Sequence, residues 1–290
     1  MLMDRTSSLS VTTAAVSFDL TTLATVKDDL QIADAASDTT LSRYITEQSA
    51  LIASYCNRVF AVESVSETIY LERDPYPYQV PGGCRQLQLS RWPLLSVSSV
   101  VQTDGGNSTT LTPYPGTTSV PADYQIMAPE GQLIRLDSFG EQMAWPAVMY
   151  QVAYQAGFVA PVDAWAASTQ YVYNAVRSNG GNLYVCTVPG ASATSGGPTG
   201  TTSGIVDGTA TWNYVGPVQA RTLPYDLEMA VLKCVVARYL ERSRDPFLKE
   251  TEDARVGRKV YWVGTMPGRD GPFTPEVMSI LDRYRVPVVA

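Results

Sequence analysis

Histidine is absent from the 290 residues of this sequence. Its absence removes the side chain that most often acts as a general base near neutral pH and that most often binds zinc. The cysteines lie tens of residues apart and form no CxxC or Cys/His metal pattern, so we interpret them as reduced thiols. The sequence therefore predicts no metal site and no cofactor, and it weighs against an enzyme.

Motifs for nucleotide hydrolysis and serine-esterase chemistry are also missing, because no GxxxxGK[ST], GxGxxG or GxSxG occurs. There is no run of about 18 apolar residues. The N-terminal segment lacks the basic and apolar regions of a secretory signal. Together with an apolar content of 45%, these features predict a soluble, non-exported globular protein with no membrane partner.

Charge is distributed unevenly along the chain, whose net charge is −7. Residues 1–160 carry 8 Lys and Arg against 16 Asp and Glu, whereas residues 221–290 carry 12 against 10. Between them, residues 162–216 contain 22 Gly, Ser and Thr, and their only charged residues are Asp163, Arg177 and Asp207. This central block therefore differs in composition from the chain on both sides of it.

Apolar residues recur at helical spacing in four segments outside the block. A short helix is predicted over 20–32, and a longer one follows Asp38, which is predicted as its N-cap. A third helix is predicted from Pro224 to about residue 245, with apolar side chains around most of its circumference, so we expect it to be buried on more than one side. A last short helix begins at Thr274-Pro275 and covers residues 275–285.

Short runs with β-like composition, separated by turn residues, lie between these helices at 66–72, 85–106, 123–136 and 146–158. They predict an antiparallel sheet whose strands are joined by hairpins. The predicted fold class is α+β, a core of helices with an antiparallel sheet plus a small all-β inserted domain. A polar leader occupies residues 1–19.

In this order, "LATVKDDLQI", "LSRYITEQSALIASYCNRVF", "LQLSRWPLLSVSSV", "DYQIMAPEGQLIRL", "VMYQVAYQAGF" and "LPYDLEMAVLKCVVARYLER" resemble the head-to-tail connector, or adaptor, proteins of tailed bacteriophages. The resemblance rests on the order of elements and covers about residues 20–160 and 218–290. It implies a non-enzymatic virion protein of the neck, assembled in the bacterial host cytoplasm. It also implies a homo-oligomeric ring, usually a dodecamer, under the portal protein, where the ring extends the channel for double-stranded DNA and carries a tail or stopper protein.

The family comparison divides the chain into four parts. The connector core is predicted over 20–161 and 217–253, and the C-terminal arm and helix over 254–290. Joining "YQAGFVAP" directly to "ARTLPYDLEMAV" restores the strand, short loop and helix of the family, so residues 162–216 are interpreted as an insertion. That insertion resembles small carbohydrate-binding-like β modules of phage structural proteins.

The aromatic residues of the insertion have two interpretations. They are either a stacking platform for sugar rings or the core that a module of about 55 residues requires. The candidate glycan-binding residues are Trp165, Tyr173, Tyr184 and Trp212. A virion surface glycan-binding protein is accordingly the alternative function. A carbohydrate-active enzyme has less support, because the insertion offers only two acids.

Two further surfaces are predicted near the C-terminus. The candidate DNA-channel residues are Arg255, Arg258, Lys259 and Arg269, for which a solvated loop or an ion-paired subunit contact is the simpler interpretation. The candidate portal-binding residues are Val277, Ile280, Leu281 and Tyr284, on one face of the last helix. The alternative for this helix is that it packs on its own subunit and closes the fold.

Overall fold

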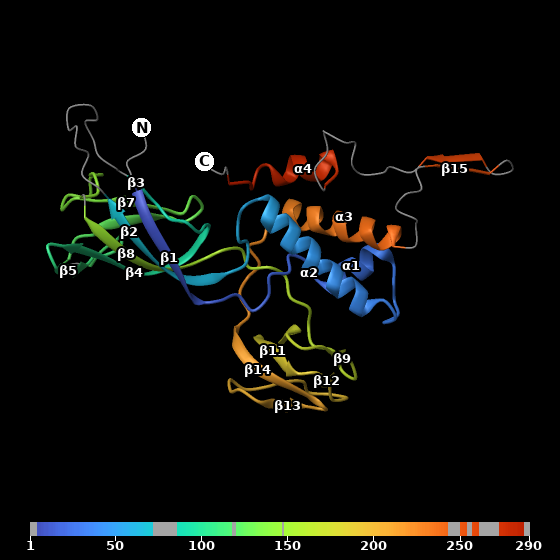
Figure 1. The fold of residues 1–290 in the computed structure, drawn as a ribbon. Helices are drawn as coiled ribbons and strands as arrows, with labels where there is room; N and C mark the ends of the chain where they lie inside the picture. The colour runs from blue at the N-terminus through green and yellow to red at the C-terminus, as the bar shows by residue number, and fades with distance from the viewer. Residues whose placement is uncertain are drawn as a thin grey trace. The chain divides into compact units, whose positions relative to one another are not determined.

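The computed structural model describes residues 5–71, 86–117, 120–146, 148–242, 250–253, 257–260 and 273–286. The chain forms two compact units, one made of Met1–Ala15 and Ala61–Phe158 and the other of Val16–Phe60 and Val159–Ala290 (Figure 1). All pairs between the named strands are antiparallel. The predicted α+β fold class is confirmed.

The first unit, called the sheet unit below, is built on a five-stranded sheet in the order β1–β2–β8–β4–β5. The strands are β1 (Arg5–Thr13), β2 (Glu63–Leu71), β4 (Leu94–Asp104), β5 (Asn107–Thr110) and β8 (Met149–Ala156). The central strand β8 pairs with β2 and β4, which are distant in sequence, so the predicted hairpin connection is wrong for these pairs. β1 pairs along most of β2, although its residues lie in the predicted polar leader.

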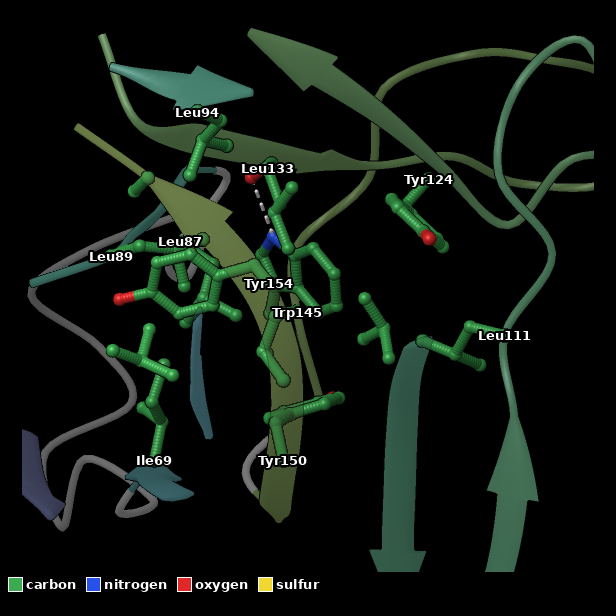
Figure 2. Close-up of a cluster of buried hydrophobic side chains, with 14 of the residues drawn as sticks. Ile69, Leu87, Leu89, Leu94, Leu111, Tyr124, Leu133, Trp145, Tyr150 and Tyr154 are labelled. Atoms are coloured by element: carbon green, nitrogen blue, oxygen red, sulfur yellow. Dashed lines mark hydrogen bonds between the residues drawn. The ribbon is translucent and has the colours of Figure 1, made fainter. Parts of the chain in front are cut away.

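A three-stranded sheet completes the sheet unit, in the order β3 (Gln86–Gln88), β7 (Gln132–Arg135) and β6 (Tyr124–Met127). Side chains of both sheets form one apolar core, which Figure 2 shows at close range. Within it, the indole N–H of Trp145 donates to the carbonyl of Leu133 at 3.3 Å, and the Tyr150 ring packs edge-on against Trp145. The buried Trp nitrogen thus has the hydrogen-bond partner that its burial requires.

One carboxylate lies inside this core. Glu67 on β2 is 0% exposed, and its Oε2 accepts hydrogen bonds from the Tyr154 hydroxyl at 2.7 Å and from the Ser90 N–H at 3.0 Å. Its Oε1 accepts from the Ser90 hydroxyl at 2.6 Å. Burial, and then the Glu67 charge, raises the pKa of Tyr154, so this hydroxyl stays protonated and remains a donor.

The end of β8 requires a glycine. Gly157 has φ of +129°, and a Cβ there would lie 2.3 Å from the carbonyl oxygen of Ala61. The close approach permits the parallel bridge between Ala61 and Phe158. Any larger residue would push these two segments apart.

The described residues of the second unit form four helices: α1 (Leu23–Leu30), α2 (Asp38–Tyr55), α3 (Tyr225–Glu241) and α4 (Pro275–Leu281). α3 contacts α1, α2 and α4, and Figure 1 shows α2 and α3 side by side. Most of the apolar face predicted for α2 is buried, although Leu51 on this face is 38% exposed. Asp38 is not the N-cap, however, because Ser37 takes that place and Asp38 accepts a hydrogen bond from the Lys27 ammonium at 2.7 Å.

Residues 162–216, called the module below, carry only short strands. A four-stranded sheet has the order β10 (Val176–Asn179), β11 (Asn182–Val188), β14 (Ala210–Pro217) and β13 (Ile205–Asp207), and a two-stranded sheet pairs β12 (Gly190–Ala191) with β9 (Gln170–Tyr171). Val159 and Thr222 lie just outside the module and are hydrogen-bonded to each other. The chain therefore enters and leaves the module at neighbouring positions.

A last pair of strands, β15 (Glu250–Asp253) and β16 (Gly257–Val260), lies between α3 and α4 along the chain. β15 lies at the end of the predicted connector core, 217–253, and β16 lies in the predicted C-terminal arm, 254–290. The backbone pairing runs in register from Glu250 opposite Val260 to Asp253 opposite Gly257. The two strands therefore pair across the predicted boundary between core and arm.

Candidate functional site

The C-terminal helix α4 forms where the sequence predicts it. The Thr274 hydroxyl accepts a hydrogen bond from the Val277 N–H, and Pro275 occupies the first helical position, where a missing N–H does no harm. The helix is short, ending at Leu281, and a helix of this length depends on tertiary packing for its stability.

The predicted portal-binding stripe is covered by its own chain. Val277, Ile280 and Leu281 are 2%, 7% and 0% exposed. α4 contacts α3, and the Phe273 ring just before it packs edge-on against Tyr55 of α2 at 5.3 Å. The arrangement is the one expected of a helix that closes the fold of its own subunit.

Tyr284 lies at the end of the same stripe and is also held by the chain. Its hydroxyl donates to Asp226 at 2.6 Å, and its ring lies edge-on to Phe60 at 6.2 Å. Burial, followed by the hydrogen bond to Asp226, raises the pKa of Tyr284. Nearby, burial raises the pKa of the Cys56 thiol to about 11, so this thiol is protonated at neutral pH.

Asp207 lies at the centre of the module. It is 4% exposed, and its Oδ2 accepts both indole N–H groups, from Trp165 at 2.7 Å and from Trp212 at 3.2 Å. Its Oδ1 accepts the backbone N–H of Ala193 at 2.9 Å. A single carboxylate therefore joins β13, β14, the segment before β9 and the segment after β12.

Three aromatic rings form the module core around this carboxylate. Tyr171, Tyr184 and Trp212 are at most 2% exposed, and the Tyr171 ring lies edge-on to Trp212 at 4.9 Å. Two of them, Tyr184 and Trp212, are predicted glycan-binding residues, and their burial leaves no ring face for a sugar. For these two positions the core interpretation explains the structure.

The other two predicted glycan-binding residues differ from each other. Trp165 is half-buried, and a loop lies over its ring, since a Cβ at Gly197 would be 2.8 Å from its Cδ2 atom. Tyr173 is 62% exposed, next to the exposed Val172. The structure thus does not bring the four residues together into one platform, and glycan binding stays a prediction that only Tyr173 is placed to serve.

Two of the four predicted DNA-channel residues fall outside the described part of the chain. Arg255 and Arg269 lie in segments that the structure does not describe. Arg258 and Lys259 lie on the backbone of β16, opposite Glu252 and Thr251. Their role in a channel therefore stays a prediction.

In the described ranges, no group of three or more His, Cys, Asp or Glu residues is placed to hold a metal ion. Over the same residues, no helix combines the length and apolar character that crossing a bilayer demands. The candidate functional features of the described residues are therefore surfaces and hydrogen-bonded clusters.

Two features of these surfaces were missed from the sequence. The central role of Asp207 depends on indoles 42 and 5 residues away, and the spacing carries no signal for this convergence. Phe139 is 89% exposed at a tight hairpin tip, for which the Asp and Gly of "DSFG" were an available turn signal.

The chain matches no protein-family model and no curated protein. Among solved structures it is similar to a chain in the neck of an empty gene transfer agent particle computed with C6 symmetry, with 15% identity, a TM-score of 0.40, and 98% of this chain and 97% of that chain covered. A chain in the virion of a native gene transfer agent particle has 14% identity, a TM-score of 0.39, and 97% of each chain covered. A chain in the neck of the native particle computed with C12 symmetry has 15% identity, a TM-score of 0.36, and 98% and 97% covered.

Proposed function

We propose that this protein is a structural subunit of the neck of a tailed phage-like particle, where copies of it form a ring between the portal and the tail. The observation that carries the proposal is the order of elements, with two helices, antiparallel sheets, a long helix α3 and a capped short helix α4. This is the order on which the resemblance to head-to-tail connectors rests. In this role the protein acts through assembly and shape, and the ring extends the DNA channel without reading sequence.

The module fits this proposal as an addition to the connector core, with boundaries 162–216. The carbonyl of Val159 accepts the N–H groups of Thr222 and Leu223, each at 3.1 Å, and the Val159 N–H donates to the Thr222 hydroxyl at 2.8 Å. Because these bonds lie outside the module, the loop that carries it is closed at its base without it. This supports an insertion into a loop that precedes α3.

The ring is tested by mass measurement on the purified protein, alone and with a purified portal ring. Native mass spectrometry should detect one closed homo-oligomer, alone or on the portal, and electron microscopy should show a central channel. A protein that stays monomeric in both conditions contradicts the proposal.

The proposal includes docking of α4 to the portal, through Val277, Ile280, Leu281 and Tyr284. The packing of α4 limits how this docking can occur. These side chains lie against their own chain, so docking through them requires α4 to leave α3. Deletion of residues 272–290 should lower the thermal midpoint, because it exposes the surface that α4 covers. Portal binding of the deleted protein is measured in parallel, and undiminished binding contradicts docking through α4.

A glycan-binding role is favoured by one observation only, the exposed ring of Tyr173. A glycan array probed with the intact protein tests it, with Tyr173→Ala as the variant and Tyr114→Ala as the control, since Tyr114 is equally exposed at 64% outside the module. Binding that Tyr173→Ala removes and Tyr114→Ala keeps supports this role. Absence of binding on the array contradicts it.

A further inference from the structure

The long helix α3 has an apolar stripe on the side away from its packed face. Its buried residues are Leu227, Ala230, Val231, Val235 and the paired Glu228. On the other side, Tyr225, Met229 and Leu240 are 77%, 39% and 66% exposed. Leu232 and Val236, both half-buried, fall between them at steps of three and four residues, which places all five on one side of the helix.

Each end of this stripe carries an arginine. The Arg221 guanidinium lies over the Tyr225 ring, 3.9 Å from its centroid, at the beginning of the helix. The Arg242 guanidinium lies over the Tyr239 ring at 3.6 Å, at its end. Arg221 also pairs with the Glu228 carboxylate at 2.7 Å, whereas no ion pair of Arg242 is found among the described residues. Over the same residues, no element is shown packed over the stripe, so it is an apolar surface with an arginine at each end.

The sheet unit presents a feature of opposite charge. Phe139 is 89% exposed at the tip of a hairpin that follows β7. The Asp137 carboxylate accepts the N–H groups of Phe139 and Glu141 at 2.9 Å each, and the Asp137 N–H donates to the Glu141 carbonyl at 2.9 Å. The tip is therefore ordered before it binds anything, which lowers the entropy cost of inserting the phenyl ring into a partner.

Charge favours a contact between this tip and the stripe on α3. The hairpin residues "LDSFGEQ" hold two acids and no base, and the segments of the sheet unit hold 10 Asp and Glu against 5 Lys and Arg. Residues 221–290 hold 12 Lys and Arg against 10 Asp and Glu. An acidic hairpin around an aromatic anchor thus complements an apolar stripe that has the Arg242 guanidinium at one end.

We propose that the stripe on α3 binds the Phe139 hairpin of a second copy of this chain. Because the two surfaces are different, each subunit offers one of them to each neighbour, and this head-to-tail contact is the kind that closes rings. The inference rests on the proposed ring function and names the surfaces that build the ring. The hairpin fills the centre of the contact, and the flanking charges set its register.

Two variants test the contact, Phe139→Asp on the hairpin and Leu240→Asp on the stripe. Both positions are exposed, so neither change is expected to disturb the fold. Val206→Asp, which changes a 74% exposed valine in the module, is the matched control. Native mass spectrometry should show that each test variant loses the homo-oligomer, with self-association weakened roughly tenfold or more, while the control assembles as the unchanged protein does.

Mixing the two variants gives the decisive measurement. The Leu240→Asp protein keeps its hairpin and the Phe139→Asp protein keeps its stripe, so one intact contact forms between them and the mixture should yield a one-to-one heterodimer. Absence of the heterodimer overturns the proposal, as does normal assembly of either variant. A third outcome is that no heterodimer forms and that only the Leu240→Asp variant loses portal binding. The stripe would then bind the portal, and the proposal would be wrong.

The same experiment separates this inference from the proposed function. If the unchanged protein forms a ring that both variants also form, the assigned surfaces are wrong and the neck function stands. If the unchanged protein stays monomeric both alone and with the portal, the proposed function itself is wrong, whatever the variants do.

Discussion

The sheet unit and the module each bury a carboxylate, but they surround it differently. Glu67 accepts hydrogen bonds from two hydroxyls and one backbone N–H, within a core that holds fifteen buried apolar residues of the described part of the unit. Asp207 accepts two indole N–H groups and one backbone N–H, within a core of five. In the small core the carboxylate therefore holds a larger share of the structure in place.

The difference reflects how little surface a short chain can bury. A module of this length rarely gains more than about 3–5 kcal/mol from a single apolar core. Hydrogen bonds to one charged acceptor add about 1.5–3 kcal/mol each at most, and they also fix which segments meet. We infer that the module depends on Asp207 for folding, whereas the sheet unit depends on Glu67 mainly for the placement of the segment around Ser90.

The largest expected effect is that of Asp207→Ala. It leaves two indole N–H groups and the Ala193 N–H without their acceptor in a buried site, at a cost of roughly 3 kcal/mol or more. This approaches the whole stability of the module, so we expect the module to unfold while the helices and the sheet unit stay folded. Tryptophan fluorescence and limited proteolysis between residues 162 and 216 measure the loss.

The control for this change is Asp163→Ala, which alters the same residue type in the same module. The Asp163 hydrogen bonds in the structure use its backbone carbonyl, which alanine keeps. A module that is equally protected from protease in Asp207→Ala and Asp163→Ala would show that the carboxylate is dispensable, and the comparison between the two cores would fail.

A smaller effect is expected for Glu67→Gln in the sheet unit. The glutamine amide would turn an N–H group toward the hydroxyl or N–H groups that now donate to Glu67, at a cost of about 1–3 kcal/mol. The larger apolar core should keep the unit folded, with a lower midpoint in urea. Glu130→Gln, at an exposed position of the same unit, should leave that midpoint unchanged.

A third change separates the two indoles around Asp207. Trp165→Phe keeps an aromatic ring but removes the N–H that donates at 2.7 Å, and Asp207 retains its other two donors. We expect a loss of about 1 kcal/mol in module stability, with the fold intact. Tyr173→Phe, at an exposed ring, is the control for ring chemistry, and a loss of similar size there would contradict the assignment to the hydrogen bond.

The smallest effect is expected for removal of the whole module. Excision of Val162–Gly216 with a short linker keeps the hydrogen bonds between Val159 and Thr222, and the cost of closing a loop changes only slowly with its length. The remaining protein should unfold at nearly the same temperature by circular dichroism and should assemble as before. An insoluble product would show that the module is part of the core.

A helix or strand of this fold could be predicted from the sequence when the interactions that form it join residues close together in the chain. The beginning of α4 was predicted correctly because the Thr274 cap and Pro275 act within one turn, whereas its predicted end at residue 285 was wrong, since the helix ends at Leu281. β1 was not, because the Ser- and Thr-rich segment has a weak pattern and its pairing partner lies more than fifty residues away. The central position of β8 was missed for the same reason.

The same dependence on distance along the chain applies to the candidate sites. The face of α4 was predicted correctly, but its burial under the chain's own helices depends on α2 and α3, which periodicity alone does not place. In the module, the sequence left two interpretations of the aromatic residues open, a core or a stacking platform for sugar rings. It did not show that Trp212 faces inward onto Asp207 while Tyr173 faces solvent.

The pairing of Val159 with Thr222 and Leu223 also has a consequence for engineering the chain. Because the chain enters and leaves the module at hydrogen-bonded neighbours, a change in the length of the chain between them leaves these bonds in place. Any small domain whose two ends lie close together meets the same geometric condition. The site is therefore also a rational position for inserting a fluorescent label or an affinity tag into the intact protein.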